Sequence, residues 1–303
     1  MDPLATLNQQ FALDNVLTFQ EHSSGLLVGR IESDLCVGQF FLQGAHVTEF
    51  QPAHTDQPVL FLSQAAIYEL HRAIRGGIPI CFPWFSNHPA DSSLPPHGWA
   101  RTTEWQVTST RYDEGKVEIR LSLNQSGWQL EYQLSFGATL QASFSATNTS
   151  PQATEFEIAL HSYFNIGAIE QVSITGDLAQ VPFLDQLTGL EHPADSQPIV
   201  FSAETDRIYQ GLASDIELHD QANQRIVRIV AENSVSTIVW NPWIAKSKRM
   251  ADFGDDEYLR MCCIETANVR QNRISIAPQS THRTSVEISV VDLARDPLRR
   301  LRR

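Results

Sequence analysis

Apolar and polar residues alternate along much of this chain. The pattern is clearest over three successive segments, 117–123, 128–136 and 140–146, in which every second residue is apolar. Because successive side chains of a β-strand point to opposite faces, this period of two predicts strands with one buried and one solvated face. Further strand candidates are the segments 26–31, 35–42, 105–111, 154–164, 170–176, 225–231, 235–240, 260–269 and 283–291.

Helical periodicity is scarce. Leu4, Leu7 and Phe11 have the spacing of one helix face, which predicts a short helix within a helical or extended N-terminal segment over residues 1–20. Closely spaced strands with turn residues between them predict an all-β fold, a large antiparallel β-sandwich with few short helices. We find no linker or repeat, so we expect residues 1–303 to form a single domain.

Two long stretches, residues 75–101 and 241–259, interrupt the strand pattern. The first contains five prolines, which cannot donate a hydrogen bond to a strand ladder, and glycines at positions 76, 77 and 98. The second mixes charged with aromatic residues. Because long ordered loops on a rigid sheet often carry binding and catalytic groups, we expect the functional site to use these stretches.

The composition argues against nucleic acid as the main ligand. The net charge is −13, whereas binding to a phosphate backbone needs a basic face. The one basic segment is the arginine-rich end of the chain, residues 293–303. We interpret it as a solvated tail, with contact to a membrane or to nucleic acid as the alternative.

The four cysteines, at positions 36, 81, 262 and 263, lack the paired spacing of metal sites. The two adjacent cysteines would point to opposite faces of a strand, so we expect neither structural disulfides nor structural zinc. No segment reaches transmembrane length, and the start lacks the basic and apolar regions of a secretory signal. These features predict a cytoplasmic protein.

Two strand candidates each carry a titratable residue within an apolar run. His161 would lie on the more polar face of segment 154–164, and Glu265 lies in the apolar segment 260–269, where burial should raise the pKa of its carboxyl group. The alternatives are a histidine hydrogen-bonded at a sheet edge and a carboxylate in a salt bridge. If the two met across a sheet, they could move protons in opposite directions on one small substrate, as in an acid–base enzyme.

Four further residues are candidates for binding. Arg75 and Arg101 stand at the ends of the first irregular stretch, and a guanidinium can bind a phosphate through two parallel hydrogen bonds. Glycines beside an arginine would let the backbone approach an anion closely. His97 could bind sugar hydroxyls, and Asp206 could accept from hydroxyls or cap a turn. For each of the four, a structural contact is the alternative.

Several familiar motifs are absent, because the chain contains no HExxH, GxSxG, GxxxxGK[ST] or GxGxxG pattern. Metal, acyl-enzyme and nucleotide chemistry therefore have no motif to support them. The triplet Asp252–Gly254 lacks the other motifs of a kinase, and we interpret the acidic run 255–257 as a solvated turn.

Six ordered blocks of sequence, read together, resemble those of one enzyme family. They resemble the glucose-6-phosphate 1-epimerases, the hexose-6-phosphate branch of the aldose 1-epimerase (galactose mutarotase) superfamily. The resemblance extends from about residue 25 to about residue 291. The blocks are RGGIPICFPW at 75–84, LPPHGWAR at 94–101, ALHSYFN at 159–165, DRIY at 206–209, NPW at 241–243 with MADFGDDEY at 250–258, and IETAN at 264–268.

This resemblance implies a β-supersandwich with the active site on the concave face of its main sheet. By motif, His161 matches the family's catalytic acid and Glu265 its catalytic base. The family interconverts α and β anomers and uses neither a metal nor an organic cofactor. The expected partner is a small hexose 6-phosphate, glucose 6-phosphate first, with no nucleic acid and no membrane. The oligomeric state is open, with a monomer favoured.

The resemblance also implies roles in substrate binding. Arg75 and Arg101 match the arginines that hold the 6-phosphate, and His97 and Asp206 match positions associated with sugar hydroxyls. Pro96 departs from the family, in which a polar residue is common. Lys246 and Lys248 could also reach the phosphate, with a surface position as the alternative. Two other functions stay open: a non-catalytic carbohydrate-binding protein, and an aldose 1-epimerase that acts on unphosphorylated sugars.

Overall fold

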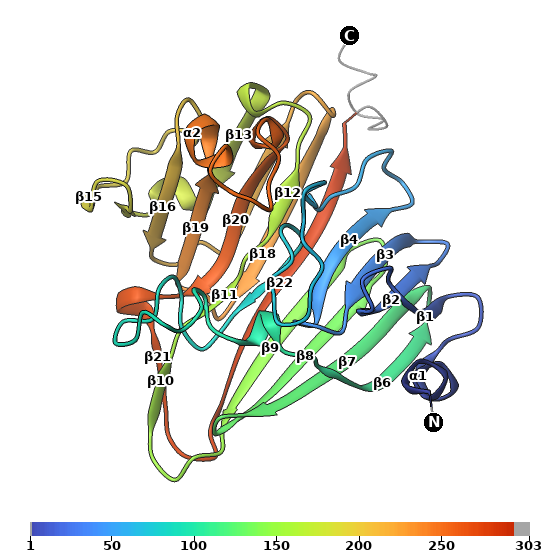
Figure 1. Cartoon of the computed structure of the whole chain (residues 1–303). Coiled ribbons are helices and arrows are strands. Elements are labelled where there is room, and N and C mark those ends of the chain that lie inside the picture. The colour runs from blue at the N-terminus through green and yellow to red at the C-terminus, as the bar shows by residue number, and fades with distance from the viewer. Residues whose placement is uncertain (1, 294–303) are drawn as a thin grey trace.

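The computed structural model describes residues 2–293, and almost all of its regular structure is antiparallel β-sheet (Figure 1). The prediction of an all-β antiparallel fold with few short helices is confirmed. Residues 294–303, which hold most of the predicted tail, lie outside the described residues. Among residues 2–293, no helix has the length and apolar character needed to cross a bilayer.

One eight-stranded sheet contains the most regular strands of the sequence. In β8 the even positions from 128 to 136 are buried and the odd ones are more exposed, as the alternation predicted. Its strand order is β13-β17-β18-β22-β9-β8-β7-β6. The strands are β6 (Gln106–Asp113), β7 (Lys116–Gln125), β8 (Trp128–Phe136), β9 (Leu140–Asn148), β13 (Val172–Gly176), β17 (Asp215–Asp220), β18 (Arg225–Glu232) and β22 (Thr281–Asp292).

A second sheet of eight strands, which we call the site sheet, has the order β15-β14-β16-β19-β20-β11-β5, and β12 also pairs with β20. Its central strand β20 is buried along its whole length. The strands are β5 (Ile80–Cys81), β11 (Ile158–Leu160), β12 (Tyr163–Asn165), β14 (Phe183–Asp185), β15 (Leu190–His192), β16 (Thr205–Gln210), β19 (Ser236–Asn241) and β20 (Met261–Asn268).

Smaller elements complete the fold. The predicted N-terminal helix is confirmed as α1, which Asp2 caps by accepting a hydrogen bond of 3.0 Å from the backbone of Leu4. The remaining strands are β1 (Leu17–Glu21), β2 (Leu27–Glu32), β3 (Cys36–Phe41) and β4 (His46–Pro52), which form a four-stranded sheet, and β10 (Thr154–Phe156) with β21 (Ile274–Ile276). The helices are α1 (Pro3–Phe11), α2 (Trp243–Ser247) and the 3₁₀ turns η1 (Ala100–Thr102), η2 (Ile169–Gln171), η3 (Asp177–Gln180), η4 (Glu257–Arg260) and η5 (Arg270–Asn272).

The site sheet is packed on both faces. Cys262 and Ile264 of β20 belong to the large core cluster, together with Phe136 and Phe144 of the other eight-stranded sheet. Cys263 belongs to a smaller apolar cluster on the opposite face. The prediction that the adjacent cysteines face opposite ways is confirmed, and all four cysteines of the chain are free and buried.

The predicted single strand over 154–164 is wrong, because this segment forms three short strands with different partners. β10 pairs with β21, whereas β11 pairs with β20 and β5. The change occurs at Glu157, whose carboxylate accepts hydrogen bonds from the backbone of Phe85 at 2.9 Å and of Arg270 at 2.6 Å. Glu155 is exposed, and its carboxylate lies 3.7 Å from the guanidinium of Arg273.

His46, at the start of β4, is fully buried and lies beside the first irregular stretch. Its Nε2 donates a hydrogen bond of 2.7 Å to the carbonyl oxygen of Gly76, while Nδ1 has no partner among the described residues. Burial lowers the pKa of His46 to about 4, with the hydrogen bond to Gly76 opposing this shift and the charge of Arg101 adding to it.

We predict that His46 makes the fold sensitive to acid. The unfolded chain binds a proton at this residue near pH 6.5 but the folded protein only near pH 4, so the free energy of unfolding should fall as the pH drops through this window. Lowering the pKa of His46 from 6.5 to about 4 corresponds to about 3 kcal/mol of unfolding free energy. Urea unfolding at a series of pH values should show this loss for the wild type.

The matched variant is His46→Gln, whose amide can still donate to the Gly76 carbonyl but cannot titrate. Its free energy of unfolding should depend less on pH between 6.5 and 4. The same slope in both proteins would contradict the assignment.

Candidate active site

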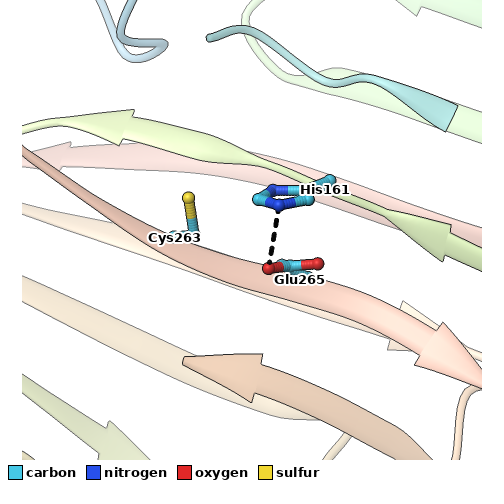
Figure 2. A group of neighbouring side chains, drawn as sticks. All are labelled: His161, Cys263 and Glu265. Atoms are coloured by element: carbon cyan, nitrogen blue, oxygen red, sulfur yellow. Dashed lines mark ion pairs between the residues drawn. The ribbon is translucent and has the colours of Figure 1, made fainter. Parts of the chain in front are cut away.

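The pairing of β20 with β11 and β12 places His161 directly opposite Glu265. β11 and β12 pair with β20 in the same register. Continued across the two residues between β11 and β12, this register sets His161 opposite Glu265. Cross-strand partners project from the same face of a sheet. Nε2 of His161 accordingly lies 3.3 Å from Oε1 of Glu265 (Figure 2). The flanking pairs that set the register are Leu160 with Thr266 and Tyr163 with Cys263.

The first irregular stretch begins beside His161. The backbone amide of His161 donates to the carbonyl of Pro79 at 3.0 Å, and that of Tyr163 donates to the carbonyl of Gly77 at 2.9 Å. Gly76 and Gly77 have φ values of 116° and 64°, and a Cβ at Gly77 would overlap the carbonyl oxygen of Val47. These glycines are therefore required for close contact between backbone segments, and the structure gives no support to the suggestion that they admit an anion.

A cavity of about 300 Å³ opens over this pair. Hollows of similar or larger size occur elsewhere on the described surface, one of about 460 Å³ near Arg225, so volume alone does not identify the site. What singles out this cavity is the convergence of titratable groups on it. Five of the six predicted site residues line it, namely Arg75, His97, His161, Asp206 and Glu265.

His161 and Glu265 are 8% and 1% exposed, and burial dominates their electrostatics. It raises the pKa of Glu265 well above its ordinary value, with the charge of Asp206 adding to the shift and that of Arg101 opposing it. Burial lowers the pKa of His161 well below its ordinary value, and the charges of Arg101 and Arg75 lower it further. Both shifts favour the uncharged forms of the two side chains.

Arg75 lines the cavity and is held by an acidic partner. Its Nε and Nη2 donate to Oδ2 of Asp252 at 3.3 and 3.1 Å, and its Nη1 donates to the hydroxyl of Tyr163 at 3.0 Å. The salt bridge that the sequence left open is thus present. Asp252 was missed by sequence reasoning, and its only signal was its place inside the block 250–258.

Arg101 is not among the residues that line the cavity. Its Nη2 donates to the carbonyl of Pro96 at 2.7 Å, and its Nε is buried without a partner among the described residues. It is nonetheless, after burial, the strongest influence on the pKa of His161 and of His97, lowering both. The contact at Pro96 uses the backbone, so it does not depend on the side chain at that position.

His97 adopts a left-handed backbone with a φ of 64° and faces the cavity. Its Nδ1 accepts a hydrogen bond of 3.2 Å from the amide of Ser86, which leaves Nε2 to carry the proton. Burial, followed by the charge of Arg101, lowers the pKa of His97 well below its ordinary value. His97 is therefore a neutral hydrogen-bond donor whose ring centre lies 5.8 Å from that of His161.

Asp206 lies within β16 and points into the cavity, so the turn-cap alternative is wrong. Its Oδ1 accepts from Nε2 of Gln186 at 2.6 Å, and its Oδ2 lies 3.8 Å from Nζ of Lys246. Lys246 also lies 3.2 Å from Glu204 and lines the cavity, whereas Lys248 is exposed. The Gln186 amide is oriented in turn by Arg270, which donates to its oxygen at 3.1 Å.

Three aromatic residues line the cavity, Phe85, Tyr163 and Trp240, and none of them was predicted as a site residue. The ring of Tyr163 stacks on His161 with centres 4.7 Å apart, and that of Trp240 lies 6.1 Å from His161 at a steep angle. Tyr163 and Trp240 are both cross-strand partners of Cys263, two residues before Glu265 on β20. Their side chains therefore lie on the same face of the sheet as the His161–Glu265 pair. In the sequence they look like core residues, and no pattern distinguishes the two roles.

The known proteins to which this chain is similar are all named as epimerases or mutarotases in the matches given below. Residues 30–289 match the model of the family described as "Aldose 1-epimerase". A protein from Cenchrus ciliaris named "Putative glucose-6-phosphate 1-epimerase" is 30% identical over 278 residues, covering 84% of this chain and 82% of the relative. An Escherichia coli K12 protein of the same name is 34% identical over 240 residues, covering 75% and 78%. The crystal structure titled as a "putative mutarotase" from Salmonella typhimurium matches with a TM-score of 0.86 and 27% identity, covering 93% and 96% of the two chains.

Proposed function

The chain belongs to the aldose 1-epimerase family, and from this premise we propose that it interconverts the α and β anomers of a hexose 6-phosphate, glucose 6-phosphate in the first place. The observation that carries the proposal is the buried pair of His161 and Glu265, 3.3 Å apart on the floor of the cavity. A cavity of about 300 Å³ is at the small end of ligand sites, which suits a monosaccharide.

The proposed chemistry is paired proton transfer. Glu265 removes the proton of the anomeric hydroxyl, the bond between C1 and the ring oxygen breaks, and that oxygen takes a proton from His161. The sugar is then an open aldehyde, and the proton has in effect passed from His161 to Glu265. Rotation about C1–C2 presents the other face of the aldehyde, and the reverse transfers close the ring as the opposite anomer.

The electrostatics of the pair fit this sequence of steps. Ring opening turns a charged pair, with the proton on His161, into an uncharged pair, with the proton on Glu265. Burial favours the uncharged arrangement because it raises the pKa of Glu265 and lowers that of His161. The site therefore assists ring opening, and the reverse proton transfers of ring closure return the pair to the charged arrangement.

Recognition of the phosphate is the finer part of the proposal. Arg75 and Lys246 line the cavity, and Arg101 acts on it from outside the lining, in a chain whose net charge is −13. Such a local cluster of cations would attract a dianionic substrate. The names of the relatives from Cenchrus ciliaris and Escherichia coli support the same substrate class.

One observation favours a second candidate, an aldose 1-epimerase that acts on unphosphorylated sugars. Arg75 and Lys246 are already paired with Asp252 and Glu204, and Arg101 lies outside the cavity lining. A polarimetric or coupled assay of anomer interconversion, run with glucose 6-phosphate beside glucose and galactose, separates the two. A non-catalytic sugar-binding protein would accelerate none of the three reactions.

We predict that Glu265→Gln and His161→Ala each lower kcat for anomer interconversion by about 10²–10⁴-fold, the usual contribution of one general acid or base. The rate is measured above the spontaneous reaction, and circular dichroism checks that each variant is folded. Glu217→Gln, which changes a half-buried carboxylate of β17 that does not line the cavity, is the control and should keep the wild-type rate. Retained turnover in either site variant would mean that the roles are misassigned.

We predict that Arg101→Ala raises KM for glucose 6-phosphate by about 10-fold, because the charge of Arg101 acts on the cavity from outside its lining and would attract the phosphate dianion. The KM for free glucose should change far less, because glucose lacks the phosphate. Arg111→Ala, which removes an exposed arginine of β6, is the matched control. Equal increases in KM for both sugars would contradict a role in binding the phosphate.

A further inference from the structure

Cys263 completes a cluster of metal-binding side chains with His161 and Glu265. All three are buried, and their donor atoms lie within 4.8 Å of one another. Figure 2 shows Cys263 and Glu265 on one strand, with His161 on the chain segment beside it. We propose that this cluster binds a thiophilic divalent cation such as Zn²⁺ or Cd²⁺, and that the bound ion inhibits the protein.

The spacing of the donors is close to that of a tetrahedral site. Ligand atoms about 2.0–2.3 Å from a tetrahedral ion lie about 3.3–3.7 Å from one another. The 3.3 Å between His161 and Glu265 already meets this condition. The full cluster span of 4.8 Å requires a movement of about 1 Å, which rotation of a cysteine or histidine side chain can supply.

The donors also have the right chemistry and supports. A thiolate, an imidazole and a carboxylate form a mixed set that suits Zn²⁺ and Cd²⁺ better than Mg²⁺ or Ca²⁺. Glu265 and Cys263 are two residues apart on β20, and His161 projects from the short segment between β11 and β12, which both pair with β20, so the sheet holds all three.

Two polar atoms of the cluster are left without partners. Oε2 of Glu265 and Nδ1 of His161 are both buried and make no hydrogen bond among the described residues. A buried polar atom without a partner is costly, and a cation bound between the two side chains would satisfy at least the carboxylate. The thiol proton of Cys263 and the carboxyl proton of Glu265 would both leave to solvent when the bonds to the metal form.

The ion would enter through the cavity. Cys263 itself is fully buried, but His161 and Glu265 line the cavity. Three protein ligands leave a fourth position open for water or a sugar hydroxyl. The inhibition rests on the proposed function, because the bound ion would engage the two side chains that transfer protons. Binding of the ion is independent of the proposed function.

The adjacent cysteine provides a matched control. Cys262 is equally buried but packs into the core on the other face of β20, away from the cluster. Cys262→Ser and Cys263→Ser therefore make the same chemical change one residue apart, on opposite faces of one strand. Glu265→Gln removes a second ligand and leaves the thiol in place, so it tests the cluster even if Cys263→Ser fails to fold.

Binding is measured first, without reference to turnover. The full-length, reduced, metal-free protein is titrated with Cd²⁺, and the thiolate-to-cadmium charge-transfer absorption is followed together with equilibrium dialysis. We expect one ion for each wild-type chain and each Cys262→Ser chain, and loss of the absorption in Cys263→Ser. In Glu265→Gln the dissociation constant should rise at least about 10-fold, as expected for loss of a direct ligand. Wild-type absorption that persists in Cys263→Ser would overturn the proposal.

Inhibition is measured second, with Zn²⁺ at buffered free concentrations. Each protein is compared with its own metal-free rate, and a chelator should restore that rate in the wild type. Half-inhibition of Cys263→Ser should require at least about 10-fold more Zn²⁺ than that of wild type or Cys262→Ser. A wild type that binds Cd²⁺ but has no epimerase activity would refute the proposed function alone, while an active wild type without the Cd²⁺ absorption would refute the metal site alone.

Discussion

The pairing register of β20 against β11 and β12 is the constraint on which the site depends. A slip of one residue would turn Glu265 into the core between the sheets and bring Ile264 to the cavity. Such a slip would bury a carboxyl group among apolar side chains and expose apolar surface, and both changes cost free energy. Because all eight residues of β20 are buried, the packing that stabilises the sheet also fixes the 3.3 Å approach of Glu265 to His161.

The strands that were predicted well are those whose surroundings differ most between the two faces. β7, β8 and β9 have a buried and a more exposed side, so their alternation is visible in the sequence. β4 was missed because a register shift in its pairing with β3 interrupts the period, and β16 because only two of its residues are aliphatic or aromatic. The break within 154–164 could not be predicted, because hydrophobic periodicity does not indicate which strand a segment pairs with. Within this segment the partner strand changes from β21 to β20.

The candidate site divides in a similar way. Titratable residues in apolar runs, such as His161 and Glu265, stand out because burial of such groups needs a reason. Tyr163 and Trp240 do not stand out, since aromatic residues in strands are ordinary core residues. Arg101 was predicted to bind substrate from its sequence motif, but it lies outside the cavity lining. Its guanidinium instead donates a hydrogen bond to the carbonyl of Pro96. The sequence indicates which chemical groups are present. Only the folded structure determines which of them line the cavity.

The floor and the rim of the cavity differ in how freely they can change. The floor is strand β20, which is packed on both faces, so almost any substitution there disturbs one of two apolar clusters. The rim is built from residues 75–101 and 241–259, which are mostly irregular and, apart from close-packed positions such as Gly76 and Gly77, tolerate replacement better than the floor does. Over evolutionary time, divergence toward other sugars should therefore accumulate in the rim while the floor is inherited. Mutagenesis libraries intended to change sugar preference are best confined to those two stretches.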